Sequence, residues 1–230
     1  MDERYVRVSE SRKKKKRLRE PVNGLTHLAG GLLACVGFVV LLARAASVGR
    51  TDQIVAFGIF GFSLIALYSA STLYHLLQLS PAGIARLRRV DHMMIFVLIA
   101  GTYTPFCLLA LGGAWRAGLL ILVWGLALCG ILLKLSWMAA PRWLSVALYL
   151  GMGWVAVIAA PALLQAMPPV GIAWVLGGGL VYSAGAVVYG LRQPDLVPGV
   201  FGFHELWHLF VVAGSACHFW AVFRYVAQLA

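Results

Sequence analysis

Charged residues are scarce in this sequence. They make up 12% of the 230 residues, and only 8 residues are acidic, whereas 61% are hydrophobic and the mean hydropathy is +0.86. Such a composition leaves too little polar surface to cover a water-soluble globule of this size. It excludes a soluble domain and predicts a polytopic membrane protein.

Cysteine is also scarce, and the spacing of the four cysteines excludes a metal knuckle. Cys35, Cys107, Cys129 and Cys217 lie inside apolar runs and form no C-x-x-C pair. We interpret them as small buried hydrophobic residues and expect no disulfide framework.

The net charge of +11 raises nucleic-acid binding as an alternative. However, the basic residues cluster at the N-terminus, with a run at 13–17, and in the short gaps between apolar segments. This distribution is typical of membrane topology signals, so we expect no nucleic-acid partner. Residues 1–20 are interpreted as a flexible, basic cytoplasmic tail that lies against anionic lipid headgroups. The apolar run at 25–43 lacks a convincing small-residue cleavage site, so it predicts a first transmembrane helix instead of a secretory signal.

Residues 21–230 are expected to form one all-α transmembrane domain with seven helices. Each apolar segment is near the ~20 residues that cross a bilayer. The segments are 24–46, 54–79, 90–111, 115–135, 143–165, 171–191 and 202–227.

The basic residues also predict the orientation of these spans. With seven spans, most of the 19 Lys and Arg residues fall on the side of the N-terminus. The positive-inside rule then places the N-terminus in the cytoplasm and the C-terminus outside, in a multi-pass protein of the cell (inner or plasma) membrane. Within span six, Gly179 with Ser183 and Ala186 with Gly190 are expected to permit close helix packing. Pro105 and Pro161 predict kinks.

The last apolar segment begins with a possible metal-binding pair. His204 and His208 lie one turn apart on one helix face, about 6 Å apart in rise, so their imidazoles can converge on one ion. The stretch reads H-E-x-x-H, which in a soluble protease would indicate zinc and a glutamate base. Glu205 projects about 100° away from His204 around the helix. Facing the metal, capping the helix and facing lipid headgroups therefore all stay open for it.

The predicted topology brings other ionisable residues to the same depth. His75 falls in the last turns of span two, with Ser71 one turn deeper, and Asp91 falls in the first turn of span three. His204 and His208 occupy the first two turns of span seven. Polar groups at such depth usually face a protein interior or a wet cavity. Three imidazoles and a carboxylate fit a catalytic zinc ion (Zn2+) with an open water position.

Each member of this set has a structural alternative. His75 could be a hydrogen-bonded buried histidine, and Ser71 a small packing residue. Asp91 could cap its helix or pair with Arg88 and Arg89.

The other histidines are expected to stay outside the metal site. A supporting or structural role is favoured for His27, and a core or interfacial position for His92. His218 lies about 21 Å along the helix from His204 and cannot bind the same ion.

These residues carry a resemblance to the haemolysin III family, the bacterial branch of the progestin and adiponectin receptor superfamily. The resemblance covers nearly the whole chain after the basic tail. It is carried by Glu20-Pro21-Val22-Asn23-Gly24-Leu25-Thr26-His27, Ser71-Thr72-Leu73-Tyr74-His75, Asp91, His204 to His208 with Leu209-Phe210-Val211, and His218-Phe219.

The resemblance implies a seven-helix bundle with zinc near its cytoplasmic side. The zinc would be bound by His75, His204 and His208, with Asp91 matching the carboxylate that holds the attacking water and Ser71 the serine of the motif. The superfamily includes alkaline ceramidases, which suggests hydrolysis of lipid amides. The family pattern gives Glu205 no catalytic role.

The sequence therefore predicts a zinc-dependent membrane hydrolase that acts on a lipid amide or ester in the cytoplasmic half of the bilayer. Asp91 would take a proton from water and Ser71 would donate to the oxyanion. The expected partners are membrane lipids and zinc, and the oligomeric state stays open. The alternative is a non-enzymatic lipid sensor or a haemolysin-type pore former with structural zinc.

Overall fold

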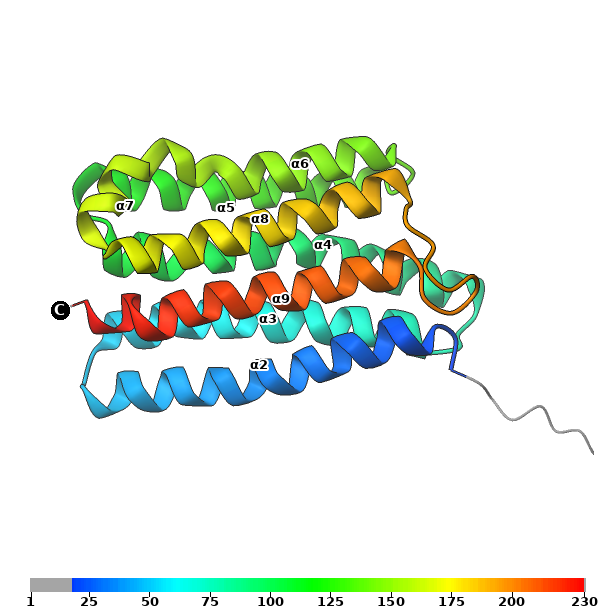
Figure 1. The fold of residues 1–230 in the computed structure, drawn as a ribbon, viewed down its shortest axis with the longest axis horizontal. Helices are drawn as coiled ribbons and strands as arrows, with labels where there is room; N and C mark the ends of the chain where they lie inside the picture. The colour runs from blue at the N-terminus through cyan, green and yellow to red at the C-terminus, as the bar shows by residue number, and fades with distance from the viewer. Residues whose placement is uncertain (1–17, 230) are drawn as a thin grey trace, which may run out of the picture.

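A computed structural model describes residues 18–229 of the chain. Most of the predicted basic tail, residues 1–17, lies outside this range. Seven helical segments are long and apolar enough to cross a membrane, and they lie side by side in one bundle (Figure 1). The helices are α2 (Pro21–Ser47), α3 (Thr51–Leu76), α4 (Pro81–Pro105), α5 (Gly113–Ser136), α6 (Arg142–Trp154), α7 (Ala160–Ala166), α8 (Pro169–Leu191) and α9 (Phe203–Arg224). The predicted all-α, seven-span, multi-pass membrane fold is confirmed.

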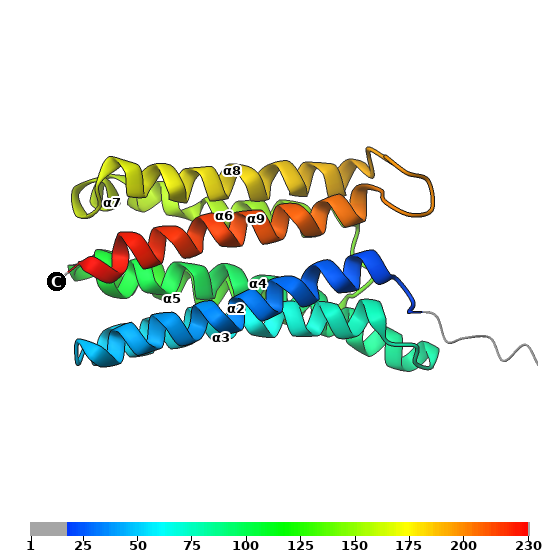
Figure 2. The ribbon, with the colours of Figure 1, turned by 60° about the horizontal axis from the view of Figure 1, so that its bottom comes forward.

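Helix α9 occupies the central position that closes the bundle. It packs against α8 on one side and α2 on the other, while α3 joins α2 to α4 (Figures 1 and 2). The first and last spans are therefore neighbours. This arrangement brings residues from the two ends of the chain to one site.

The outer surface of the bundle is apolar, as a lipid-facing surface must be. Leu33 on α2 is 67% exposed and Ile121 on α5 is 72% exposed, whereas several polar side chains are buried inside. Cys35 and Cys129 are also exposed, so the predicted burial is wrong for these two thiols and right for Cys107. Because the helices are apolar almost all round, sequence pattern alone did not separate their lipid face from their core face.

Helix α4 begins well before the apolar segment that predicted it. Pro81 occupies its first turn, and the Ser80 hydroxyl caps it by accepting a hydrogen bond from the Gly83 amide at 3.3 Å. Asp91 thus lies ten residues beyond Pro81, and the prediction that it falls in the first turn is wrong. The reason is that the first turns of α4 are basic and project beyond the apolar core. The capping role for Asp91 is excluded.

The fifth span is broken within the bundle. Between α6 and α7 the chain forms a 3-10 turn at Val155–Ala159, and Pro161 lies in the first turn of α7. The Tyr103 hydroxyl accepts from the Ala156 amide at 2.8 Å and donates to the Gly153 carbonyl at 2.6 Å. Because no water is available there, a side chain satisfies the backbone groups that the break frees.

Close packing of α8 on α9 uses a different set of small residues from the predicted one. A side chain at Gly178 would collide with His218, and one at Gly185 would collide with Phe210. Gly179 has no such neighbour, and the Ser183 hydroxyl accepts a hydrogen bond from Trp154 instead. Small residues of span six therefore do permit close packing, as predicted, but Gly178 makes the close approach and the neighbouring Gly179 does not.

One end of the bundle, which we call the tail end, collects residues 18–20, 77–80, 137–141 and 192–202 (Figure 1). Most basic residues of the described chain lie at or near this end: Arg19, Arg86, Arg88, Arg89, Lys134, Arg142 and Arg192. The opposite end has Arg44, Arg50, Arg116 and Arg224. By the positive-inside rule, the tail end is the predicted cytoplasmic side.

Candidate metal centre

Three histidines converge near the tail end of the bundle. His75 comes from the last turn of α3, and His204 and His208 come from the first two turns of α9. One ring nitrogen from each residue lies within 4.8 Å of the others. His75 and His208 are 1% and 2% exposed. The structure thus brings together the three residues that the sequence predicted as metal ligands.

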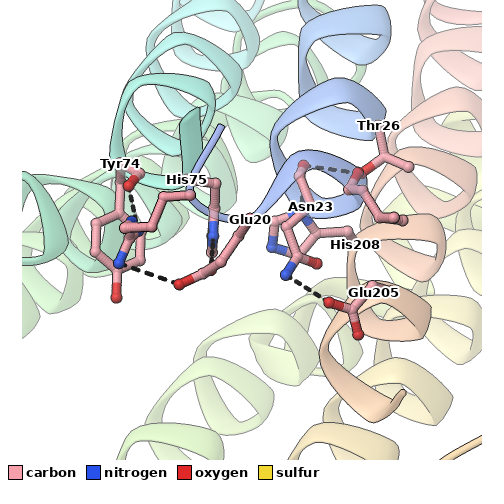
Figure 3. Close-up of polar contacts among 9 residues, drawn as sticks. Glu20, Asn23, Thr26, Tyr74, His75, Glu205 and His208 are labelled. Atoms are coloured by element: carbon pink, nitrogen blue, oxygen red, sulfur yellow. Dashed lines mark hydrogen bonds and ion pairs between the residues drawn. The ribbon is translucent and has the colours of Figure 1, made fainter. Parts of the chain in front are cut away.

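The donor atoms of this cluster fit a zinc ion. Nδ1 of His75 pairs with the Glu20 carboxylate, and Nδ1 of His208 lies 3.1 Å from the Asn23 carbonyl (Figure 3). His75 Nε2 is buried and has no hydrogen-bond partner. Tetrahedral ligands at about 2.1 Å from zinc are about 3.4 Å apart, which small side-chain movements would reach. Imidazole nitrogens suit zinc and other transition-metal ions, and do not suit Mg²⁺ or Ca²⁺, which prefer oxygen ligands.

Ser71 and Asp91 lie next to this cluster on the wall of one cavity. Ser71 is one turn before His75 on α3 and is 1% exposed, and its hydroxyl has no partner with hydrogen-bond geometry. Asp91 lies on the neighbouring helix α4, close enough to interact with the Ser71 hydroxyl and the His75 ring. The predicted carboxylate and serine therefore lie beside the histidines, on the wall of the same cavity.

Glu205 has a structural position. Its Oε2 accepts a hydrogen bond from the Gly202 amide at 2.9 Å, and its Oε1 accepts one from the Asn23 side-chain amide at 2.7 Å (Figure 3). The carboxylate thereby caps α9 and ties it to α2. Of the alternatives that the sequence left open for Glu205, the structure selects the cap.

The remaining histidines have different surroundings. His27 is 3% exposed, and its ring stacks on that of His208 with centroids 3.7 Å apart. His92 lines the same cavity as Asp91, inside the bundle, which is one of the two positions expected for it. His218 Nδ1 lies 2.8 Å from the Gly214 carbonyl of its own helix, away from the cluster.

The cavity extends from the histidine cluster towards the opposite end of the bundle. Its volume is about 280 Å³. Asp91, His204 and His208 line it near the tail end, and its lining is mostly apolar. Leu163, Met167 and Ile172 line it near the far end. An elongated, mostly apolar cavity of this kind suits a hydrocarbon chain with its polar group at the tail end.

Sequence reasoning gave no role to Glu20, which contacts the cluster. This residue directly precedes α2, and the hydrogen bond with His75 holds the pKa of its carboxyl below the usual value. The sequence does mark Glu20 as unusual, because it is the one acidic residue next to the predicted first span on its cytoplasmic side. Its partner on α3 was not predictable from spacing.

Comparison with known proteins gives a family. Residues 15–219 match the family described as Haemolysin-III related. The chain belongs to this family. It is 39% identical over 210 residues to the "Hemolysin-3 homolog" of Bacillus subtilis (strain 168), covering 91% of this chain and 95% of the relative. The resemblance to haemolysin III stated from the motifs is confirmed.

Other relatives extend this similarity beyond one protein. "Hemolysin-3" of Bacillus cereus is 35% identical over 211 residues, covering 92% of this chain and 93% of the relative. The human "Monocyte to macrophage differentiation factor" is 27% identical over 177 residues, covering 73% of this chain and 69% of the relative. This haemolysin III protein therefore shares most of its length with bacterial and animal proteins.

Proposed function

We propose that this haemolysin III protein is a zinc-dependent hydrolase that cleaves an amide or ester bond of a lipid inside the membrane. One observation carries the proposal: His204 and His208 line one largely apolar cavity together with Asp91 and Ser71, and His75 converges on these two histidines. In catalytic zinc sites, three protein ligands leave a position open for water or substrate.

His75, His204 and His208 would hold the ion through one ring nitrogen each. Zinc, when bound, supplies Lewis acidity that polarises a carbonyl group and lowers the pKa of water towards about 7. Two of the rings are oriented by hydrogen bonds at Nδ1, which favours binding through Nε2.

Asp91 and Ser71 would act on the substrate side of the site. Asp91 accepts the proton of the attacking water as a general base. The Ser71 hydroxyl lies beside Asp91 on the cavity wall and would donate to the substrate oxygen as negative charge develops there. Both groups reside on rigid transmembrane helices, which limits the reorganisation that the reaction requires.

A lipid substrate follows from the cavity beyond these residues. Its far half is lined by aliphatic side chains such as Leu163 and Ile172. A hydrocarbon chain in this half would place an amide or ester carbonyl beside the histidines. The apolar lining also limits the access of bulk water to the site.

The name "Hemolysin-3" of the Bacillus cereus relative supports a second function, a cytolytic pore. A water-filled pore through one chain needs a mostly polar lining along its whole length, whereas the lining of this cavity is mostly apolar. The hydrolase is therefore the better-supported function, with a lipid sensor or a pore containing structural zinc as the alternatives.

The test begins with protein purified in detergent without chelators. We expect close to one zinc per chain, and incubation with a lipid extract followed by mass spectrometry should show a fatty acid released from a lipid. Metal-free wild-type protein would overturn the metal site. Retained zinc without any change in the lipids would overturn the hydrolase and favour the sensor, and dye release from vesicles would favour the pore.

A further inference from the structure

Glu20 contacts the buried end of α3 although it lies outside every transmembrane helix. Its Oε2 pairs with Nδ1 of His75 (Figure 3). The side chain of Glu20 is 38% exposed and that of His75 is 1% exposed, so the carboxylate joins the buried ring to the surface of the bundle.

The position of Glu20 is fixed by several neighbouring contacts. Its backbone amide donates to the His75 carbonyl at 2.9 Å. Arg19 lies 3.1 Å from the Glu20 carboxylate, donates to the Tyr74 carbonyl and lies 4.3 Å from the centre of the Tyr74 ring. The carboxylate is therefore held against α3 by both backbone and side-chain contacts.

The Glu20 contact determines which nitrogen of His75 is available. A histidine that donates its Nδ1 hydrogen to a carboxylate presents the Nε2 lone pair on its other side. In this structure His75 Nε2 is buried and without a hydrogen-bond partner. The ring centroids of His204 and His208 lie 5.2 Å and 4.8 Å from that of His75.

The same short segment also orients His208. The Asn23 carbonyl lies 3.1 Å from Nδ1 of His208, and the Asn23 amide group donates to Glu205 at the start of α9. Two of the three histidines are thus held by residues 20–23, although these residues are distant from both in sequence.

We propose that Glu20 is a positioning residue for the metal centre, which accepts a hydrogen bond from His75 Nδ1 and thereby directs Nε2 towards His204 and His208. The inference rests on the metal site of the proposed function but does not require hydrolysis. The competing explanation is that Glu20 only anchors residues 18–20 to α3.

The test measures zinc affinity by competition with a chelator, using the full-length protein in detergent. Loss of a carboxylate that supports a metal-binding histidine typically weakens metal binding by about 10–100-fold, and we expect Glu20→Gln to fall in this range. The visible spectrum of the cobalt(II)-loaded protein should also change, because this spectrum reports ligand geometry. Glu20→Asp keeps the carboxylate and should have an affinity between those of wild type and Glu20→Gln. It also provides the test if Glu20→Gln does not fold.

Two controls separate positioning from anchoring. Arg19→Gln removes contacts to Tyr74 and Glu20 but leaves the Glu20 pair with His75, so zinc affinity and the cobalt spectrum should change much less than in Glu20→Gln. Asp52→Asn makes the same carboxylate-to-amide change in an exposed ion pair at the opposite end, and it should have no effect.

The zinc measurements distinguish failure of the positioning role of Glu20 from failure of the proposed metal site. If wild type binds zinc and Glu20→Gln binds it equally well, the positioning role is overturned and the metal site stands. If Arg19→Gln weakens zinc binding as much as Glu20→Gln does, anchoring explains the contact and the inference is overturned. If wild type binds no zinc, the metal site itself is overturned.

Discussion

The two ends of the bundle treat buried polar groups in different ways. At the opposite end, buried Gln53 donates to the Ala227 carbonyl at 3.3 Å but its side-chain oxygen has no partner, and Arg50 and Asp52 form an exposed ion pair. Near the tail end, the buried atoms without partners include His75 Nε2 and both ring nitrogens of His27. A buried polar group without a partner costs free energy, and near the tail end these groups are imidazole nitrogens, which a metal ion can satisfy. This difference supports the metal site proposed at the tail end.

The largest effect is expected from removing a histidine of the three-histidine cluster and comparing it with removal of a histidine outside the cluster. His75→Ala should abolish stoichiometric zinc binding and lipid hydrolysis, because only two converging ligands remain. His218→Ala is the matched control, since its Nδ1 is already bonded to its own helix. Elemental analysis of the purified proteins measures both. Equal zinc contents in the two variants would contradict the assignment of the cluster.

Asp91→Asn should separate metal binding from catalysis. The amide cannot accept a proton, so we expect the hydrolysis rate to fall by about 10²–10⁴-fold. Zinc content should remain that of wild type, because the three histidines are unchanged. Lipid mass spectrometry with zinc analysis of the same sample makes the measurement, and an unchanged rate would remove Asp91 from the mechanism.

Close packing of α8 on α9 should contribute to the stability of the bundle, and a change there should have a smaller effect than loss of a histidine or of Asp91. Gly178→Val should destabilise the protein by about 1–3 kcal/mol, because the added side chain collides with His218. Gly177→Val is the control, since a Cβ there has no neighbour within 4 Å. Thermal unfolding in detergent compares the two. Equal Tm values would show that this packing contact is not tight in solution.

The exposed ion pair at the opposite end should matter least. Arg50→Gln leaves Asp52 in solvent, and single surface pairs contribute little because water screens them. We expect Tm, zinc content and hydrolysis to match wild type. A clear loss of zinc in this variant would show that the two ends are coupled.

The sequence predicted the spans and the three histidines for a simple reason. Span length and the positive-inside rule fix the depth of each residue, and His75, His204 and His208 share one depth. Depth does not fix which helix faces which, so the stacking of His27 on His208 and the cavity position of His92 required the structure. Start positions also required it, because α4 begins in a basic segment that hydropathy does not detect.

The contribution of residues 20–23 was hidden from sequence reasoning for a different reason. Glu20 acts on α3 and Asn23 acts on α9, and neither contact follows a helical repeat. Contacts of this kind depend on which spans are neighbours, and the sequence does not reveal that α2 lies beside both α3 and α9.

The adjacency of the first and last spans has a consequence for biosynthesis. Two of the three histidines lie on α9, near the C-terminus. Asn23, which contacts His208 and Glu205 on α9, lies near the N-terminus and is therefore inserted long before them. During insertion from the N-terminus, no intermediate that lacks the seventh span can assemble the three-histidine cluster. The proposed ion would therefore be acquired only after the last span is in place, and its presence would report that the seventh span has entered the membrane.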